Sequence, residues 1–364
     1  MNIIEPTLIL DTDKCLSNIR SILKKAEDSG VIFRPHFKTH NSLEIGKWFR
    51  EEGVGKITVS SVRMAEYFAE GGWSDITIAL TFNIHETGKV NELIRSGKRI
   101  NLTIDSPETL KSLLNKLNYP AHFFLKIDTG YNRTGIMAEN FEEISSILFM
   151  ARGSKLKFSG FLTHSGHSYR AGTKEEIIDI FNDTKKKMSG LKKRFVDEYP
   201  DLLISVGDTP TISIVPELKG VDEIRPGNFV FYDLMQHALG SCTSDKIAVI
   251  MAAPVISRNE DRKEIVIYGG AVHLSKEFIT DNSGERNYGH PVLLNSDGWG
   301  DMLPGSRITS MSQEHSVISA DDVFFKSVSI GDMIGIVPVH SCLAANLAGH
   351  YRTVDGLIIS KNRY

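Results

Sequence analysis

The stretch VIFRPHFKTH, residues 31–40, decides the fold, because it is a short β-rich run that ends in polar and basic side chains. Similar runs recur before residue 240, and the segments between them carry apolar residues at helical spacing. The eight expected strands are residues 31–38, 56–61, 75–80, 100–105, 122–128, 158–164, 202–208 and 222–230. Repeated strand-then-helix units predict a (β/α)₈ barrel of the TIM type, while counting alone leaves a doubly wound open sheet as an alternative.

The pattern changes after about residue 240 to strands that are separated only by turns. Examples are residues 246–258, the run VFFKS at 323–327 and the run DMIGIVPVHSC at 332–342. These runs predict a second, mainly antiparallel β domain. The expected organisation is an N-terminal strand in residues 1–18 that could pair with the later domain, a barrel in residues 19–240, and a β domain in residues 241–364.

Composition narrows the possible functions. The chain has 364 residues, enough for about two domains. Its net charge is −3, and positive and negative residues are mixed along the sequence, which argues against a nucleic-acid partner. No signal-peptide pattern and no apolar stretch of about 18 residues is present, so we expect a cytoplasmic protein without a membrane partner. The three cysteines, Cys15, Cys242 and Cys342, are odd in number and far apart, which argues against a disulfide framework.

Lys38 closes the first expected strand, and active sites of such barrels lie at the carboxyl ends of their strands. One interpretation is a solvated surface charge. The other is a lysine that forms a Schiff base, whose amine must be partly desolvated and near cationic groups to be nucleophilic. Arg34, His36 and His40 would supply that cationic setting.

Two glycine-bearing turns follow the seventh and eighth expected strands. Main-chain N–H groups and hydroxyls at these positions of a barrel often hold a phosphate. Gly207, Thr209 and Thr211 on the first turn, with Gly227 and Asn228 on the second, could have this role. Each turn taken alone is equally consistent with an ordinary turn.

The run VPVHSC, residues 337–342, places His340 and Cys342 two residues apart. On a strand, such residues project to the same face, so an imidazole and a thiolate could bind one ion. A nitrogen and a sulfur ligand suggest zinc, and the remaining positions would belong to water or substrate. The alternative is a buried cysteine beside a hydrogen-bonded histidine.

Together these motifs resemble the fold-type III pyridoxal-phosphate enzymes, the alanine racemase-like group, and within it the D-serine dehydratase and D-threonine aldolase family. The similarity covers almost the whole chain. Its most specific pieces are PHFKTH, HSGHSY, GDTPT, RPGNFVFYD and VPVHSCLAANL. The last piece distinguishes this branch from plain racemases, which lack the metal pair.

The resemblance implies that Lys38 carries pyridoxal 5′-phosphate as a Schiff base. It also implies that Arg133 lies near the 3′-oxygen of the cofactor and Tyr169 near its pyridine ring. The 5′-phosphate would be held by Gly207, Thr209, Gly227 and Asn228, and the metal by His340 and Cys342. It leaves open the roles of His36, His40, His164, His167 and Arg225.

The implied activity is that of a lyase that acts on D-3-hydroxy amino acids with pyridoxal phosphate and a divalent metal. Cys342 favours a zinc-dependent D-serine or D-threonine dehydratase, because the aldolases of the family pair the histidine with a harder oxygen ligand suited to manganese. A D-threonine aldolase that yields glycine and an aldehyde is the alternative. A racemase is a further alternative, although it would have no use for His340 and Cys342. The resemblance also implies a homodimer.

Overall fold

The computed structural model describes residues 3–280 and 284–362, and the chain forms two compact units. One unit comprises Ser21–Lys38 and Gly46–Gly227. The other comprises the described residues up to Arg20, the short segment Thr39–Ile45, and the chain from Asn228 onward. The units therefore exchange segments along the chain, and Lys38 and Thr39 are consecutive residues that belong to different units.

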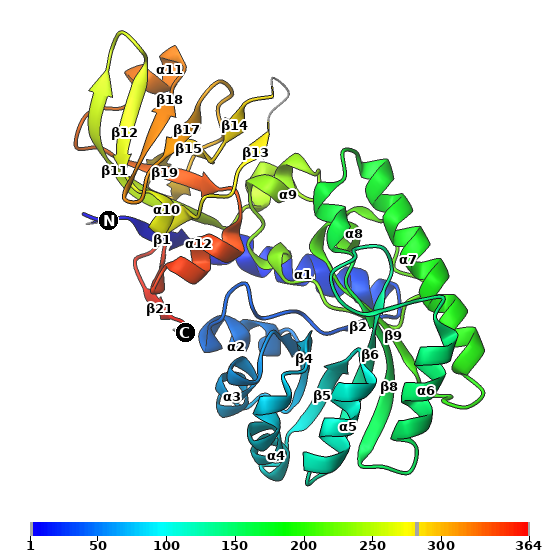
Figure 1. The fold of residues 1–364 in the computed structure, drawn as a ribbon. Helices are drawn as coiled ribbons and strands as arrows, with labels where there is room; N and C mark the ends of the chain where they lie inside the picture. Colours follow the sequence, from blue (N-terminus) through cyan, green and yellow to red (C-terminus); the bar gives the residue numbers. More distant parts are fainter. Residues whose placement is uncertain (1–2, 281–283, 363–364) are drawn as a thin grey trace. The chain divides into compact units, whose positions relative to one another are not determined.

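The first unit is built on a parallel sheet with the strand order β2-β10-β9-β8-β6-β5-β4-β3 (Figure 1). Its strands are β2 Ile32–Phe33, β3 Lys56–Val59, β4 Asp75–Thr81, β5 Arg99–Ile104, β6 Ala121–Asp128, β8 Leu156–Thr163, β9 Leu203–Val206 and β10 Glu223–Ile224, and β7 Ile136–Met137 pairs with β6. A parallel bridge between His36 and Thr58 joins the segment after β2 to β3, so the two ends of the sheet meet. The predicted eight-stranded α/β barrel is thus confirmed.

Helices follow the barrel strands and surround the sheet (Figure 1). They are α2 Leu43–Glu51, α3 Val62–Glu70, α4 Thr87–Arg95, α5 Pro107–Lys116, α6 Phe141–Ala151, α7 Lys174–Phe195 and α8 Thr209–Ile214, with α1 Thr12–Asp28 before them. Side-chain oxygens of Ser61, Ser106 and Thr173 accept main-chain N–H groups at the first turns of α3, α5 and α7. Such caps satisfy donors that have no partner within the helix, and they set where each helix begins.

The second unit contains a mainly antiparallel sheet with the main order β16-β15-β19-β11-β1-β20-β21. Its strands are β1 Thr7–Leu10, β11 Val249–Asn259, β12 Glu264–Tyr268, β15 Gly289–Asn295, β16 Gly298–Trp299, β17 Arg307–Met311, β18 His315–Ser319, β19 Met333–Pro338, β20 His350–Thr353 and β21 Ile358–Ser360. The N-terminal strand β1 pairs antiparallel with β11 and parallel with β20. The unit also contains the hairpin of β13 Ile279–Thr280 and β14 Arg286–Asn287, and the short helices α9 Leu234–Ala238, α10 Ala271–Leu274, α11 Asp322–Lys326 and α12 Ser341–Leu347.

One expected strand of the β unit is wrong, and another is present but ends earlier than expected. The run VFFKS lies in helix α11, because the Asp321 carboxylate accepts the N–H groups of Val323 and Phe324 and begins a helix there. Strand β19 ends at Pro338, so His340 and Cys342 lie at the start of helix α12 rather than on a strand. No helix in the described part of the chain is long and apolar enough to cross a membrane.

Candidate active site

The main chain at Lys38 is anchored while its side chain is exposed. The neighbouring Phe37 is fully buried, with its ring centroid 4.9 to 5.1 Å from those of Phe49, Phe68 and Trp73. Its N–H group donates to the Thr58 carbonyl at 2.9 Å. Packing therefore fixes the end of the first strand and leaves the Lys38 amine available at the barrel rim.

The expected cationic setting of Lys38 is wrong in part. The Arg34 guanidinium donates to Glu223 Oε2 at 2.7 Å and to Asp75 Oδ1 at 2.6 Å, so two carboxylates neutralise its charge. His40 is fully buried, and burial lowers its pKa to about 3, which keeps its ring uncharged at neutral pH. Neither side chain can supply a positive charge to the lysine.

His164 lies near the charge of Lys38 at this rim, where the Lys38 N–H group also donates to His36 Nδ1 at 3.3 Å. The Nδ1–H group of His164 donates to the Gly207 carbonyl oxygen. Burial, and next the charge of Lys38, lower the pKa of His164 to about 3, so the ring is neutral and its Nε2 atom is an acceptor. His167 has a different place, because its ring stacks on Tyr131 with centroids 6.4 Å apart. The structure thus separates two histidines that the sequence could not tell apart.

Three of the residues assigned to cofactor binding meet beyond the carboxyl ends of β8 and β9. The Thr209 N–H group donates to the Tyr169 hydroxyl at 3.4 Å. Gly207 packs so closely on Arg225 that a Cβ atom at position 207 would lie 3.0 Å from the Arg225 Cβ atom. Hydroxyls and main-chain N–H groups in such a turn are suitable donors for a phosphate.

Asp208 and Thr211 stabilise the same turn. The Thr211 N–H and hydroxyl groups both donate to the Asp208 carboxylate at 2.7 Å, so the Thr211 hydroxyl has a structural role. Asp208 is fully buried, and burial raises its pKa to about 6. The carboxylate caps the first turn of α8 and holds Thr209 in place.

Gly227 and Asn228 follow β10, and they fall in different units. The Asn228 side-chain amide donates to Asp233 and to the Ser341 hydroxyl, while its Oδ1 atom is buried and has no hydrogen-bond partner in the described part of the chain. Phosphate oxygens are acceptors, so this oxygen is unsuitable for them. Only the main-chain N–H group of Asn228 could hold a phosphate.

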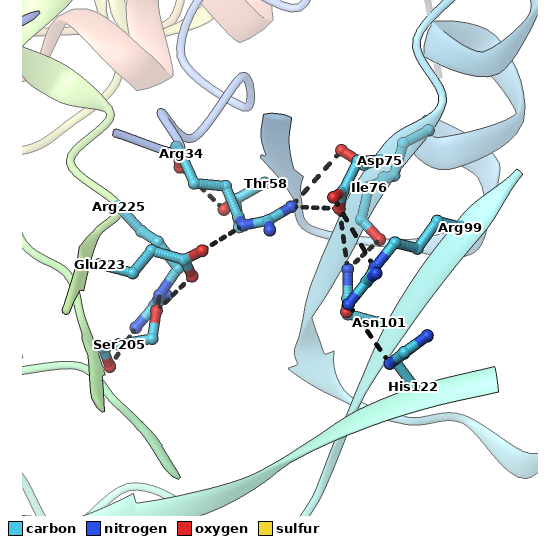
Figure 2. Close-up of polar contacts among 10 residues, drawn as sticks. All are labelled: Arg34, Thr58, Asp75, Ile76, Arg99, Asn101, His122, Ser205, Glu223 and Arg225. Carbon is cyan, nitrogen blue, oxygen red and sulfur yellow. Dashed lines mark hydrogen bonds and ion pairs between the residues drawn. The ribbon is translucent and has the colours of Figure 1, made fainter. Parts of the chain in front are cut away.

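Arg225 is held by a polar network that crosses the barrel interior, and Figure 2 shows its members. Its Nε atom donates to Ser205 Oγ at 2.7 Å, and that hydroxyl donates to Glu223 Oε1 at 2.7 Å. Glu223 also accepts the Arg34 bond, so one buried carboxylate faces two guanidinium groups. Burial lowers the pKa of Arg225 to about 10, which leaves it cationic at neutral pH.

No role was predicted for Lys126, yet its side chain belongs to the same cationic region. It is buried on β6, and burial, followed by the charges of Arg133 and Arg225, lowers its pKa to about 8. Arg133 is exposed, with its guanidinium 4.9 Å from the centroid of the Tyr131 ring. A lysine between the apolar residues Leu125 and Ile127 of the strand was the available signal. Together with Lys38, these basic groups suit a ligand that carries phosphate and carboxylate charges.

The expected metal pair lies in the other unit, where His340 immediately precedes α12 and Cys342 is in its first turn. The two side chains are hydrogen-bonded to each other even though they are not on a strand. Cys342 Sγ also lies 3.1 Å from the Thr39 hydroxyl oxygen. Buried Asp233 accepts the Ser341 N–H group at 2.9 Å, which fixes the turn between the two.

The donor chemistry of this pair fits a divalent ion. Burial alone would lower the pKa of His340, but Cys342 and then Glu277, whose Oε2 atom is 2.7 Å from His340 Nδ1, raise it to about 11. An ion would therefore replace a proton between the imidazole and the thiolate. In the described part of the chain no group of three or more His, Cys, Asp or Glu side chains could hold a metal, so water or substrate would complete the coordination.

Comparison with known families gives a name to this arrangement. Residues 10–234 match the model described as the N-terminal domain of alanine racemase. The chain belongs to this family. Residues 248–354 of this alanine racemase-like chain match a second model, described as a putative serine dehydratase domain. The resemblance to fold-type III pyridoxal-phosphate enzymes is thereby confirmed.

Individual relatives extend over nearly the whole alanine racemase-like chain. A D-serine dehydratase of Dictyostelium discoideum is 29% identical over 97% of this chain and 94% of its own length. The solved D-threo-3-hydroxyaspartate dehydratase of Delftia sp. HT23 covers 100% of this chain and 98% of its own, with a TM-score of 0.91 and 24% identity. A variant of that dehydratase in which alanine replaces a cysteine is described as being in the metal-free form. The solved D-threonine aldolase of Filomicrobium marinum covers 98% of this chain and 94% of its own, with a TM-score of 0.77 and 19% identity.

Proposed function

We propose that this alanine racemase-like chain is a lyase that dehydrates D-3-hydroxy amino acids to a keto acid and ammonia, with pyridoxal phosphate and zinc. D-serine, D-threonine and D-threo-3-hydroxyaspartate are the candidate substrates. The D configuration and the dehydration reaction are those printed in the names of the dehydratase relatives. The barrel, residues 19–240, would bind the cofactor, and the β domain, residues 241–364, would supply the metal pair.

One observation carries the proposal. The Thr39 hydroxyl lies 3.1 Å from Cys342 Sγ, and Thr39 is peptide-bonded to Lys38. The proposed metal pair is therefore tied to the residue next to the proposed cofactor lysine. An ion in this position is useful when the reaction breaks a bond to a β-hydroxyl group, since a Lewis acid stabilises the departing oxygen.

The residues of the chain have distinct parts in this reaction. When bound, pyridoxal phosphate supplies an electron sink at the substrate α-carbon, and a divalent ion supplies a Lewis acid for the β-hydroxyl. Lys38 would hold the cofactor, and its amine, once free, would remove the α-proton of the substrate. Loss of water across the Cα–Cβ bond gives an enamine, which tautomerises and is hydrolysed to the keto acid and ammonia.

The remaining residues bind and orient the cofactor. We propose that Arg133 lies near its 3′-oxygen, Tyr169 near its ring, and neutral His164 beside Lys38. The 5′-phosphate would be held by main-chain N–H groups of Gly207, Thr209, Gly227 and Asn228 and by the Thr209 hydroxyl. Arg225, which is cationic and lies next to Gly207, matches the position that faces the pyridine nitrogen in alanine racemases.

Two other activities are less well supported. A D-threonine aldolase would cleave the Cα–Cβ bond, and its family pairs the histidine with an oxygen ligand, whereas the second ligand here is the Cys342 sulfur. A racemase would leave His340 and Cys342 without a function, and the match of residues 248–354 to a dehydratase domain also argues against it.

Product identity tests the proposal directly. Purified protein with pyridoxal phosphate and zinc is incubated with D-threonine, and 2-oxobutyrate, ammonia, glycine, acetaldehyde and the threonine isomers are quantified. We expect 2-oxobutyrate and ammonia in equal amounts, and parallel assays with D-serine and D-threo-3-hydroxyaspartate rank the substrates. Glycine with acetaldehyde would show an aldolase, and L-threonine or allo-threonine would show a racemase or epimerase.

Removing either metal ligand gives a second prediction. His340→Ala and Cys342→Ala should both lose bound zinc. In both variants dehydratase activity should fall by roughly a thousandfold, because Lewis-acid stabilisation is worth several kcal/mol. Both variants should keep the cofactor, since Lys38 is unchanged. Elemental analysis, absorbance and turnover measure the three properties. Full activity of wild-type protein after thorough chelation would remove the metal from the mechanism.

Two further parts of the proposal concern the setting of the enzyme. In the described part of the chain, Cys15, Cys242 and Cys342 form no disulfide, which fits a reducing cytoplasm. We also propose a homodimer, which the exposed apolar side chains of Ile4, Leu347 and Ile358 support. They line part of a hollow of about 200 Å³ in the β unit, and exposed apolar side chains gathered in one place favour association.

A further inference from the structure

Glu277 is the carboxylate bonded to the ring of the proposed metal ligand His340. Its Oε2 atom lies 2.7 Å from His340 Nδ1. Glu277 belongs to the segment between α10 and β13, and its side chain is 41% exposed, compared with 25% for that of His340. Nothing in the proposed reaction requires a carboxylate at this position, so the contact needs a separate explanation.

The contact decides which ring nitrogen is available to an ion. A carboxylate accepts hydrogen bonds, so His340 must carry a proton on Nδ1 where it meets Glu277. The lone pair that binds an ion is then on Nε2, the nitrogen opposite the carboxylate. Metal-binding histidines commonly donate their second N–H group to a carboxylate in this way, which fixes the ring orientation and makes the ligating nitrogen more basic.

The other carboxylate near the pair has a different part. Asp233 is fully buried and accepts bonds from the N–H and hydroxyl groups of Ser341 and from the Asn228 amide. It therefore holds the turn between His340 and Cys342 but does not bond to the imidazole. The Thr39 hydroxyl is on the sulfur side of the pair, 3.1 Å from Cys342. Of these two carboxylates, Glu277 is the one that bonds to the imidazole and can orient it.

We infer that Glu277 is a positioning residue for the metal site: it holds His340 by its Nδ1–H group so that Nε2 and the Cys342 thiolate bind one divalent ion together. The inference rests on the proposed metal pair and adds a third residue that does not touch the ion. It also assigns a function to part of the Gly- and Asn-rich stretch of residues 275–310, of which residues 281–283 lie outside the described residues. The segment that carries Glu277 becomes part of the metal site.

Zinc affinity tests the inference without depending on turnover. Apoprotein is titrated with zinc against a chromophoric chelator, and cobalt is used in parallel because its spectrum reports thiolate ligation. Glu277→Ala should lower zinc affinity by about 10- to 100-fold, the usual loss when such a carboxylate is removed, and should keep the cobalt–thiolate band at saturation. Glu277→Gln should bind more tightly than Glu277→Ala, because its amide oxygen still accepts the Nδ1–H bond.

Matched variants separate this inference from the proposed function. Glu314→Gln, in the exposed turn between β17 and β18, should leave zinc affinity unchanged, whereas His340→Ala and Cys342→Ala should abolish tight binding. Wild-type affinity in Glu277→Ala, with binding lost in the two ligand variants, would overturn the role of Glu277 alone. Wild-type affinity in the ligand variants would overturn the metal pair itself. Loss of the cobalt–thiolate band in Glu277→Ala would show a collapsed site and would also contradict a positioning role.

Discussion

Lys38→Ala is expected to remove the covalently held pyridoxal phosphate and to lower dehydratase turnover by about 10²- to 10⁴-fold, the contribution of a well-placed general base. The Lys38 side chain is exposed, and the strand end is held by buried Phe37, so the substitution should leave the fold intact. Loss of the absorbance band at roughly 420 nm measures the cofactor. Far-ultraviolet circular dichroism measures the fold.

Lys47→Ala is the matched control, because Lys47 is an exposed lysine on the neighbouring helix α2. It should keep both colour and activity. Borohydride reduction of wild-type protein should place a pyridoxyl group on the peptide that contains Lys38. A yellow Lys38→Ala variant, with the label on another lysine, would refute the assignment. Lys126 is the rival to examine first, since burial lowers its pKa to about 8.

The barrel could be predicted because its signals are local. Helix α7, Lys174–Phe195, occupies one of the segments with apolar residues at helical spacing, and Thr173 caps its first turn. Acidic residues in that turn and basic residues in the last one favour the same boundaries through the helix dipole. All eight strands overlap the expected ranges; β4, β5, β6 and β8 extend one or two residues beyond them, and β2 and β10 contain only two residues each.

The errors in the β unit arise where contacts between distant residues outweigh strand propensity. The run VPVHSC was read as a strand because of its valines. The chain turns there because the Ser341 N–H group donates to Asp233, 108 residues earlier in the chain, and helix α12 follows. A periodicity argument cannot detect such a partner, so the geometry proposed for His340 and Cys342 was wrong although their proximity was right.

In the candidate site too, local sequence signals reveal some residues, whereas others depend on partners that are distant in the sequence. Strand-end position and motif were enough to nominate Lys38, Tyr169, Gly207 and Thr209, and the structure brings the last three together. Nothing local to Glu223 or Glu277 indicates a partner. Glu223 bonds to Arg34 across 189 residues, and Glu277 bonds to His340 across 63. Residues such as Glu223 and Glu277, which orient other site residues, could not be predicted because their partners are distant in the sequence.

Glu223→Ala is expected to give the largest loss of stability, about 3–5 kcal/mol of unfolding free energy, because it leaves buried guanidinium charge without its partner. Glu223 is completely buried, and it lies opposite Arg34 and Arg225, whose exposed fractions are 3% and 5% (Figure 2). Asp75 can still neutralise Arg34, but Arg225 keeps hydrogen bonds to Ser205 and the Thr163 carbonyl and only the weaker charge interaction with Asp208. Glu223→Gln preserves an acceptor and should lose less.

Urea unfolding followed by tryptophan fluorescence measures the effect. Trp48 and Trp73 belong to the barrel unit, and a Trp299→Phe background removes the signal from the other unit. Glu92→Ala, on the exposed face of α4, is the control and should change stability by no more than about 0.5 kcal/mol. Equal unfolding curves for Glu223→Ala and Glu92→Ala would show that the buried carboxylate does not stabilise the barrel.

A double-mutant cycle distinguishes a paired network from independent contacts. If Glu223 compensates the charge of Arg34, Arg34→Ala combined with Glu223→Ala should cost less than the sum of the two single losses, by about 0.5–3 kcal/mol. Additive losses would instead mean that each side chain contributes through its packing. A buried ion pair often adds little stability over apolar residues of the same size. Stability alone therefore does not explain a buried carboxylate at position 223, and there is another reason for it. That reason is the cationic Arg225, which the same carboxylate holds against the Gly207 turn at the end of β9.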